Sequence, residues 1–167
     1  GALRLPPDRL ELFLDARLSR AERELILHLI DRRVVLRQPL AYLLGEAWLR
    51  GRRFLSDQRA LVPRSLIAEA IEEGLGDWYA QSPATVLDLC TGGGSIAIIA
   101  AQHWDEAQVV GSDLSAEALA LARANVDLHQ LGGRLELIQG DLFEGLGERR
   151  FDLILCNPPY VNETTMA

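Results

Sequence analysis

The four residues Asn157-Pro158-Pro159-Tyr160 could do chemistry on a nitrogen of low reactivity. The nitrogen of an –NH2 group in an amide or an aromatic amine is a poor nucleophile, because its lone pair is delocalised. The side-chain oxygen of Asn157 and the carbonyl oxygen of Pro158 can each accept one N–H, and Tyr160 can stack on a planar acceptor. Positioning of this kind can supply several kcal/mol of an activation barrier, up to about 7–11 kcal/mol in ideal cases. The motif therefore indicates transfer of a group such as a sulfonium methyl to an –NH2 nitrogen.

The same motif could instead form an ordinary turn, since Asn-Pro often marks one. A given string of four residues is expected by chance in a chain of 167 residues only about once in a thousand. No strong base is needed before methyl transfer, because the alkylated nitrogen becomes acidic and loses its proton. The lack of a His or Lys beside the motif is therefore compatible with catalysis.

A glycine cluster gives a second candidate site, because Thr91-Gly92-Gly93-Gly94 directly follows the apolar run 85–90. Glycine lets the backbone approach a ligand closely and allows positive φ. The match to the dinucleotide fingerprint is poor, since no third glycine follows Gly94 at the required spacing, and no P-loop lysine is present. The cluster could be only a tight turn between a strand and a helix. Its place at the carboxyl end of a predicted parallel strand favours a ligand site.

Three carboxylates accompany this loop. Asp113 ends the next predicted strand, where it could accept hydrogen bonds from two ribose hydroxyls; the alternative role as a helix cap is already filled by Ser115. Asp141 could accept from an adenine amino group while Leu142 packs on the ring, or it could simply begin a turn. Asp88 lies inside a predicted strand, and a buried carboxylate needs partners, so it should bind loop N–H groups or a cofactor amine.

The elements that must position these residues alternate from residue 84 onward. Continuous apolar strands that alternate with helices predict a parallel, doubly wound sheet. The expected strands span 85–90, 108–112, 134–138 and 152–156, and the expected helices span 95–103 and 116–129.

The N-terminal half has a different pattern. Capping boxes that begin at Asp8 and Ser19 predict two helices. Residues 46–63 predict a hairpin or two short strands, and Ser65 caps a further helix that ends before Gly76. We expect a domain boundary near residue 80.

The composition excludes several function classes. The net charge of −7 argues against direct binding to nucleic acid. No apolar run approaches the roughly 20 residues needed to span a bilayer, so no membrane partner is expected. Two cysteines, Cys90 and Cys156, make neither a disulfide framework nor a zinc site, so we expect no metal and a reducing cytoplasm. Because they end neighbouring strands, they should lie within about 10 Å of each other as reduced core residues.

These motifs resemble the S-adenosylmethionine-dependent methyltransferases of the HemK/PrmB type, which modify the side-chain amide nitrogen of a glutamine in a protein. The resemblance covers most of the chain beyond residue 38. It is carried by residues 86–97, 113–115, 140–143 and 157–161, and by shorter stretches between residues 39 and 65.

The resemblance implies S-adenosyl-L-methionine as cofactor and a Rossmann-like methyltransferase sheet. Residues 1–45 would form a helical substrate-recognition domain, although packing or dimerisation is an equal alternative. Residues 46–80 would be a hairpin and helix linker, and residues 81–167 the cofactor-binding domain. Catalysis would fall to Asn157, Pro158 and Tyr160, and the glutamine would contact Asn157, Pro158, Pro159, Tyr160 and Arg64. The implied cofactor-binding residues are Asp88, Cys90, Thr91, Gly92, Gly93, Gly94, Asp113, Leu114, Asp141, Leu142 and Asn157.

The residues within the motifs favour one branch of this family. Asp-Leu-Cys-Thr at 88–91 and Val-Pro-Arg-Ser at 62–65 are more similar to the branch that acts on the third protein of the large ribosomal subunit. Alternatives are a release-factor glutamine methyltransferase, an adenine amino-group methyltransferase on DNA or RNA, and a cofactor-binding module without turnover. The family's sheet has seven strands and this sequence supplies four. We therefore expect a sheet truncated after its fourth strand, which puts the activity of this chain by itself in question.

Overall fold

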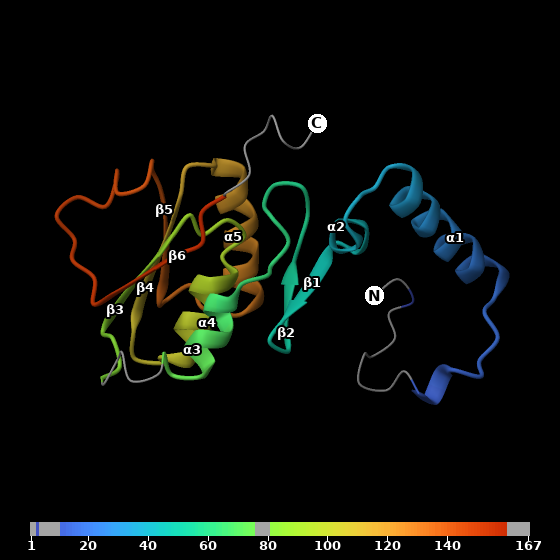
Figure 1. Cartoon of the computed structure of the whole chain (residues 1–167), viewed down its shortest axis with the longest axis horizontal. Helices are drawn as coiled ribbons and strands as arrows, with labels where there is room; N and C mark the ends of the chain where they lie inside the picture. Colours follow the sequence, from blue (N-terminus) through green and yellow to red (C-terminus); the bar gives the residue numbers. More distant parts are fainter. Residues whose placement is uncertain (1–2, 4–10, 76–80, 160–167) are drawn as a thin grey trace.

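The computed structural model describes residue 3 and residues 11–75 and 81–159, and places a helical part at one end of an elongated molecule and a sheet at the other (Figure 1). None of the helices in these ranges has the length and hydrophobicity that crossing a lipid bilayer requires. The elements are α1 (Arg20–Val35), α2 (Leu40–Leu44), β1 (Glu46–Leu49), β2 (Arg52–Leu55), α3 (Leu66–Glu72), β3 (Thr85–Leu89), α4 (Ser95–His103), β4 (Gln108–Asp113), α5 (Ala116–Leu128), β5 (Leu135–Gln139) and β6 (Leu153–Cys156).

The strands β3 to β6 form one parallel sheet in the order β5-β4-β3-β6, which confirms the predicted strands and their direction. Because β4 and β5 are added on one side of β3 and β6 on the other, the strand order reverses between β3 and β6. Ligands of open parallel sheets bind beyond the carboxyl ends of the strands at such a switch point. The register places Leu89 of β3 opposite Cys156 of β6.

The side chains of this sheet contribute to two apolar cores. Val86, Val109 and Leu155 pack in one cluster with residues from α3, α4 and α5. The helix α4 is apolar on all sides, and its residues 96–101 are all buried there. The other face carries Leu87, which packs with Leu146 from the connection between β5 and β6. The helices α3, α4 and α5 lie on one side of the sheet (Figure 1). Residues 140–152, which connect β5 to β6, contain no helix.

The hairpin predicted within residues 46–63 is confirmed as the antiparallel pair β1 and β2, whereas residues 59–63 form no strand. Its two turn residues, Arg50 and Gly51, both have positive φ, as the tightest hairpin turns require. Phe54 of β2 is fully buried in the main core, with its ring centroid 5.0 Å from that of His129. Arg50 and Arg52 also pair with Glu72 of α3, so the hairpin is fastened to the helical side of the sheet.

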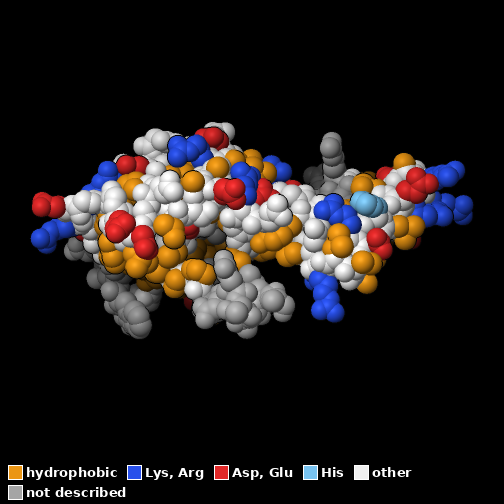
Figure 2. Space-filling view, turned by 90° about the horizontal axis from the view of Figure 1, so that it is seen from above, with side chains coloured by type: hydrophobic (Ala, Val, Ile, Leu, Met, Phe, Trp, Pro, Cys, Tyr) orange, Lys and Arg blue, Asp and Glu red, His pale blue; other side chains and the backbone are white. Residues whose placement is uncertain are grey.

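One prediction for the N-terminal part is wrong and another is confirmed. Residues 11–13 form only a short 3-10 turn, and no α-helix continues through residue 18; residues 4–10 lie outside the described ranges. The side chains at positions 12 and 14 are three-quarters exposed, and a short helix without packing is marginal in water. The capping box of Ser19 and Glu22 does begin α1. No residue of α1 is buried, and apolar and charged side chains are interspersed at that end of the molecule (Figure 2).

The helix that Ser65 caps is also confirmed, since the Ser65 hydroxyl accepts from the amide of Ile67 at 3.1 Å. Gly76, expected just after this helix, and the expected boundary near residue 80 lie outside the described residues.

The burial of Phe54 predicts how strongly the hairpin depends on the core. Phe54→Ala should lower the free energy of unfolding by about 3–5 kcal/mol, because it leaves a cavity that the packed helices cannot fill. Equilibrium unfolding in urea measures this loss. The matched control is Trp48→Ala on β1, since Trp48 is 51% exposed and its truncation should cost less than about 1 kcal/mol. Equal losses in the two variants would show that Phe54 does not anchor the hairpin.

Candidate functional site

The loop after β3 turns sharply because Cys90, Gly92 and Gly94 adopt left-handed backbone conformations, with φ of 60°, 56° and 80°. Three amides of this loop are bonded within the chain, since Thr91 donates to the Ser112 carbonyl, Gly92 to the Asp113 carboxylate and Gly94 to the Thr91 carbonyl. A side chain at Gly94 would be strained twice, since its Cβ would also lie 3.1 Å from the Cβ of Ala122 in α5. The loop therefore rests on α5 at a distance that requires glycine.

The buried carboxylate of Asp88 holds this loop to the first turn of α4. Its Oδ2 accepts from the Thr91 hydroxyl at 2.5 Å and from the Ala97 amide at 3.0 Å. Its Oδ1 is equally buried but has no hydrogen-bond partner within the described part of the chain. Burial raises the pKa of Asp88 to about 7; the two hydrogen bonds oppose this rise, and the charge of Asp113 adds to it.

Asp113 braces the loop from the neighbouring strand. Its Oδ2 accepts from the Gly92 amide at 2.8 Å, and its Oδ1 accepts from the Ser115 amide at 2.9 Å. The structure thus brings Asp113 to the glycine loop. Ser115 caps α5 by accepting from the Ala118 amide, as the sequence predicted.

Apolar side chains surround the same edge of the sheet. Leu114 follows β4, and Leu142 and Phe143 follow β5, and all three are more than half exposed. Exposed apolar groups that gather at a strand end could cover the face of a planar ring. The Leu142 carbonyl accepts from the Ser112 hydroxyl at 3.4 Å, which ties this segment to β4. Asp141 is exposed beside Leu142.

The acceptor motif leaves the sheet beside the glycine loop. Because Leu89 and Cys156 are opposite each other, Asn157 follows β6 where Cys90 follows β3. Asn157 and the two prolines after it are exposed, whereas Tyr160 lies outside the described residues. Arg64 is exposed, and its positive charge opposes the rise that burial causes in the pKa of Tyr42. No contact joins Arg64 to Asn157 within the described ranges.

The two cysteines confirm the predicted strand order. The Cys90 thiol lies within hydrogen-bond reach of Cys156, and burial together with the Cys156 thiol raises the pKa of Cys90 to about 11. The prediction that both are core residues is wrong for Cys156, which is exposed. The reason is that β6 is an edge strand among the described strands.

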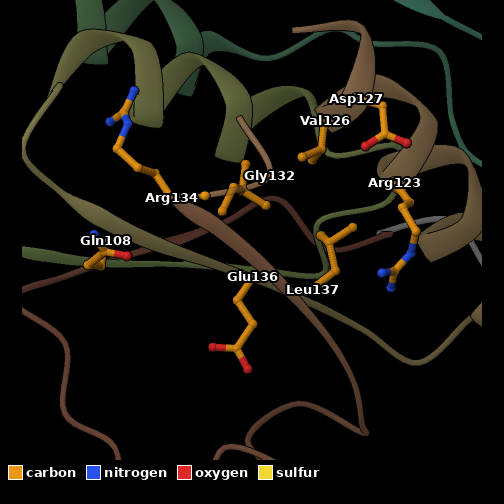
Figure 3. A pocket seen from close by; sticks show the side chains of 10 residues that line it. Gln108, Arg123, Val126, Asp127, Gly132, Arg134, Glu136 and Leu137 are labelled. Carbon is orange, nitrogen blue, oxygen red and sulfur yellow. The ribbon is translucent and has the colours of Figure 1, made fainter. Parts of the chain in front are cut away.

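A hollow of about 580 Å³ lies elsewhere, at the amino ends of the strands (Figure 3). It is formed by the first residues of β4 and β5 and by the second half of α5. None of the predicted site residues lines it. The residues that line it are Gln108, Arg123, Val126, Asp127, Gly132, Gly133, Arg134, Leu135, Glu136 and Leu137.

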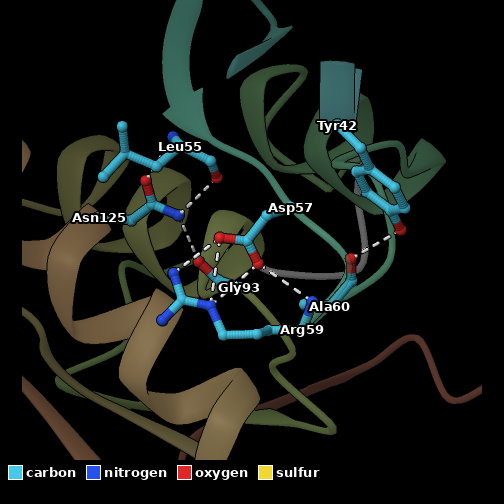
Figure 4. Close-up of polar contacts among 7 residues, drawn as sticks. All are labelled: Tyr42, Leu55, Asp57, Arg59, Ala60, Gly93 and Asn125. Atoms are coloured by element: carbon cyan, nitrogen blue, oxygen red, sulfur yellow. Dashed lines mark hydrogen bonds and ion pairs between the residues drawn. The ribbon is translucent and has the colours of Figure 1, made fainter. Parts of the chain in front are cut away.

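Sequence reasoning missed Asn125 and the segment 55–60, which contact the glycine loop from outside the motifs (Figure 4). Asn125 is fully buried and donates to the Gly93 carbonyl at 2.9 Å. The signal was available for Asn125, since it interrupts an apolar helix face that contains Leu121, Ala122 and Val126, and a buried amide needs partners. The contact of residues 55–60 comes from tertiary packing and leaves no local pattern.

Asp88 predicts a pH dependence of stability with a definite sign. Its pKa is about 7 in the folded chain and 3.8 ordinarily, so between these values the folded chain keeps a proton that the unfolded chain has lost. The free energy of unfolding should therefore fall as pH rises from about 4 to about 7. Asp88→Asn cannot ionise and should remove a fall on the order of 4 kcal/mol. Urea unfolding at a series of pH values measures it.

The control for this prediction is Asp152→Asn at the amino end of β6. Asp152 accepts from the amide and hydroxyl of Thr85 and from the Ala84 amide, and these hydrogen bonds lower the pKa of its carboxyl. Its contribution to stability is present above its unfolded pKa and is lost as pH falls through the folded one. Asp152→Asn should therefore leave the slope between about pH 4 and 7 unchanged. An unchanged slope in Asp88→Asn would refute the assignment.

Residues 75–167 match the family model of the methyltransferase small domain. A relative from Bordetella pertussis named ribosomal protein uL3 glutamine methyltransferase is 53% identical, over 98% of this chain and 56% of its own length. Proteins of the same name from Burkholderia pseudomallei and Xylella fastidiosa are 46% and 49% identical, over 99% and 97% of this chain and 57% and 52% of their own lengths. The chain therefore spans about half the length of the curated relatives that it matches.

Solved structures share the fold. An S-adenosylmethionine-dependent methyltransferase from Agrobacterium tumefaciens superposes with a TM-score of 0.55 at 22% identity, over 68% of this chain and 39% of that protein. The human methyltransferase 10 domain containing protein superposes with a TM-score of 0.52 at 16% identity, over 69% and 58%. These likenesses confirm the predicted Rossmann-like methyltransferase fold, and the relatives confirm the resemblance stated from the motifs. The chain belongs to the methyltransferase small domain family.

Proposed function

We propose that this chain forms the cofactor-binding and acceptor-positioning part of a methyltransferase that modifies the side-chain amide nitrogen of a glutamine. The observation that carries the proposal is the β3–β6 register, which sets Asn157 beside the glycine loop. The glycine loop after β3 suits a nucleoside cofactor, and the loop after β6 suits an –NH2 group. The shared name of the relatives supports a large-subunit ribosomal protein, uL3, as the substrate.

The residues at the glycine loop fit S-adenosyl-L-methionine, whose sulfonium supplies an electrophilic methyl group when bound. Asp88 Oδ1 is a buried acceptor without a donor among the described residues, and it lies under the glycine loop, whose Thr91 hydroxyl is bound by the Oδ2 of the same carboxyl group. The carboxylate of Asp113 has lone pairs left for ribose hydroxyls after binding Gly92 and Ser115. Two neighbouring carboxylates also favour a cofactor that carries positive charge. Leu114 and Leu142 would flank the adenine, with Asp141 at its edge.

The acceptor loop would work by orientation. Asn157 and Pro158 would each accept an N–H of the glutamine amide through an oxygen atom, which fixes the nitrogen and directs its lone pair toward the glycine loop. Tyr160 would stack on the amide plane. The two prolines keep this loop stiff, since each has a fixed φ and neither donates a backbone N–H. A stiff loop holds the attacking geometry at low entropic cost.

The remaining parts would recognise the protein substrate. Residues 1–45 would contact the substrate, and residues 46–80 would link them to the cofactor-binding domain at residues 81–167. Arg64 would lie on the side where the substrate binds. The exposed apolar side chains of α1 suit a protein partner better than a polyanion. The substrate would be met in the cytoplasm, where ribosomal proteins are made.

A methyl-transfer assay tests the substrate. The natural full-length protein and S-adenosyl-L-methionine with a labelled methyl group should label uL3 and should not label a class I release factor or an adenine-containing DNA. Replacing glutamines of uL3 one at a time with asparagine should abolish the label at a single position. Labelling of the release factor or of DNA instead would identify one of the alternative functions. Cofactor binding with no labelling would indicate a module without turnover.

Asn157→Ala predicts a loss confined to the chemical step. The variant should reduce kcat about 100-fold, because the amide nitrogen is no longer held in its attacking geometry. Its affinity for S-adenosyl-L-methionine, measured by calorimetry, should change much less than kcat. A variant that keeps its kcat would exclude Asn157 from the acceptor site.

A further inference from the structure

The side chain of Asn125 joins the hairpin to the cofactor loop. It is fully buried in α5, and its Oδ1 accepts from the Leu55 amide at 2.7 Å. Its Nδ2 donates to the Leu55 carbonyl at 3.2 Å and to the Gly93 carbonyl at 2.9 Å (Figure 4). Both amide hydrogens are thus used, one on each segment. A buried amide with all its donors paired fixes the groups that it binds, because releasing either one leaves an unpaired polar group.

The bond to Gly93 has a direct effect on the loop. It holds the peptide plane between Gly93 and Gly94, and the N–H of that plane donates to the Thr91 carbonyl at 2.9 Å. Thr91 is in turn bonded to Asp88. Asn125 therefore holds the glycine loop from α5, whereas Asp88 holds it from β3.

The segment after β2 covers the outside of the same loop. A Cβ placed on Gly92 or Gly93 would lie 3.8 Å from the Cβ of Ala60, so a methyl group at either position would already be in contact with Ala60. The Tyr42 hydroxyl donates to the Ala60 carbonyl at 2.9 Å and secures it from α2 (Figure 4). The loop is thus enclosed between Asn125 and Ala60.

We propose that Asn125 is a positioning residue for the cofactor loop and that segment 55–60 forms the outer wall of the cofactor site. This inference rests on the proposed function and deepens it. The hairpin and α2 then act on cofactor affinity directly, although they lie outside the strands and loops that form the rest of the site.

His129 offers the matched control one helical turn further along α5. Its Nε2 donates to the Arg53 carbonyl at 2.9 Å, and its ring packs against that of Phe54 at an interplanar angle of 42°. It therefore fastens the same hairpin to the same helix, but it has no described contact with the glycine loop. If Asn125 served only to attach the hairpin, Asn125→Ala and His129→Ala would have the same effect on cofactor affinity.

The test compares the affinity for S-adenosyl-L-methionine with thermal stability in the full-length protein. Asn125→Ala should weaken calorimetric affinity about tenfold, because the loop loses one hydrogen bond that orients it. His129→Ala should lower Tm to a similar extent and leave the affinity within about twofold. Tyr42→Phe removes the hydroxyl that bonds the Ala60 carbonyl and also interacts with the backbone of Val62, and it should weaken affinity about threefold with little change in Tm.

The outcomes separate this inference from the proposed function. Unchanged affinity in Asn125→Ala and Tyr42→Phe overturns the inference even if uL3 is methylated. Equal affinity losses in Asn125→Ala and His129→Ala overturn it as well. If Asn125→Ala does not fold, Asn125→Ser takes its place, because it too lacks the Nδ2 donor to the Gly93 carbonyl. If the wild-type protein binds the cofactor but does not methylate uL3, only the proposed substrate is wrong. If it binds no cofactor, both the proposed function and this inference are wrong.

Discussion

The pairing of β3 with β6 is the constraint on which the site depends. These strands are separated by more than sixty residues, yet their register puts Leu89 opposite Cys156 and so sets two loops side by side. A shift of one residue would move every side chain of β6 to the other face of the sheet, with Leu155 leaving the core. The apolar packing of β6 therefore fixes the distance between the glycine loop and Asn157. The same register between β3 and β6 thus determines both the burial of Leu155 and the position of Asn157.

The glycine loop is a strained turn that polar groups hold in place. Cys90 has positive φ although it carries a side chain, which costs on the order of 1 kcal/mol. Asp88, Asp113 and Asn125 each hydrogen-bond one part of the turn, and each belongs to a different element. Burial of Asp88 is the costly part of this arrangement, as its raised pKa shows. The hydrogen bonds from Thr91 and Ala97 offset part of this cost, because they stabilise the charged form of the carboxyl group.

The sequence was informative wherever a local pattern has a local cause. Apolar runs, glycine turns and helix caps predicted the helices and strands from residue 84 onward to within about one residue at each end, and the motifs pointed to Asp88, Asp113 and Asn157. The short helix α2 was not predicted. The sequence failed for the helix expected after Asp8, because helical spacing alone does not stabilise a short segment without packing. It also missed Asn125, whose partners Leu55 and Gly93 are distant in the chain and become neighbours only in the folded state.

The hairpin β1–β2 belongs physically with the sheet and not with the N-terminal helices. A two-stranded hairpin is marginal in water, so its stability must come from what it packs on. Here Phe54 enters the main core, Asn125 and His129 bind its backbone, and Arg52 reaches Glu72 and Gln102. The helix α1 has no comparable anchor, since none of its residues is buried. The helix α2 is held to the segment after β2 by the bond from Tyr42 to Ala60, so any movement of the N-terminal part relative to the sheet would take place before residue 40.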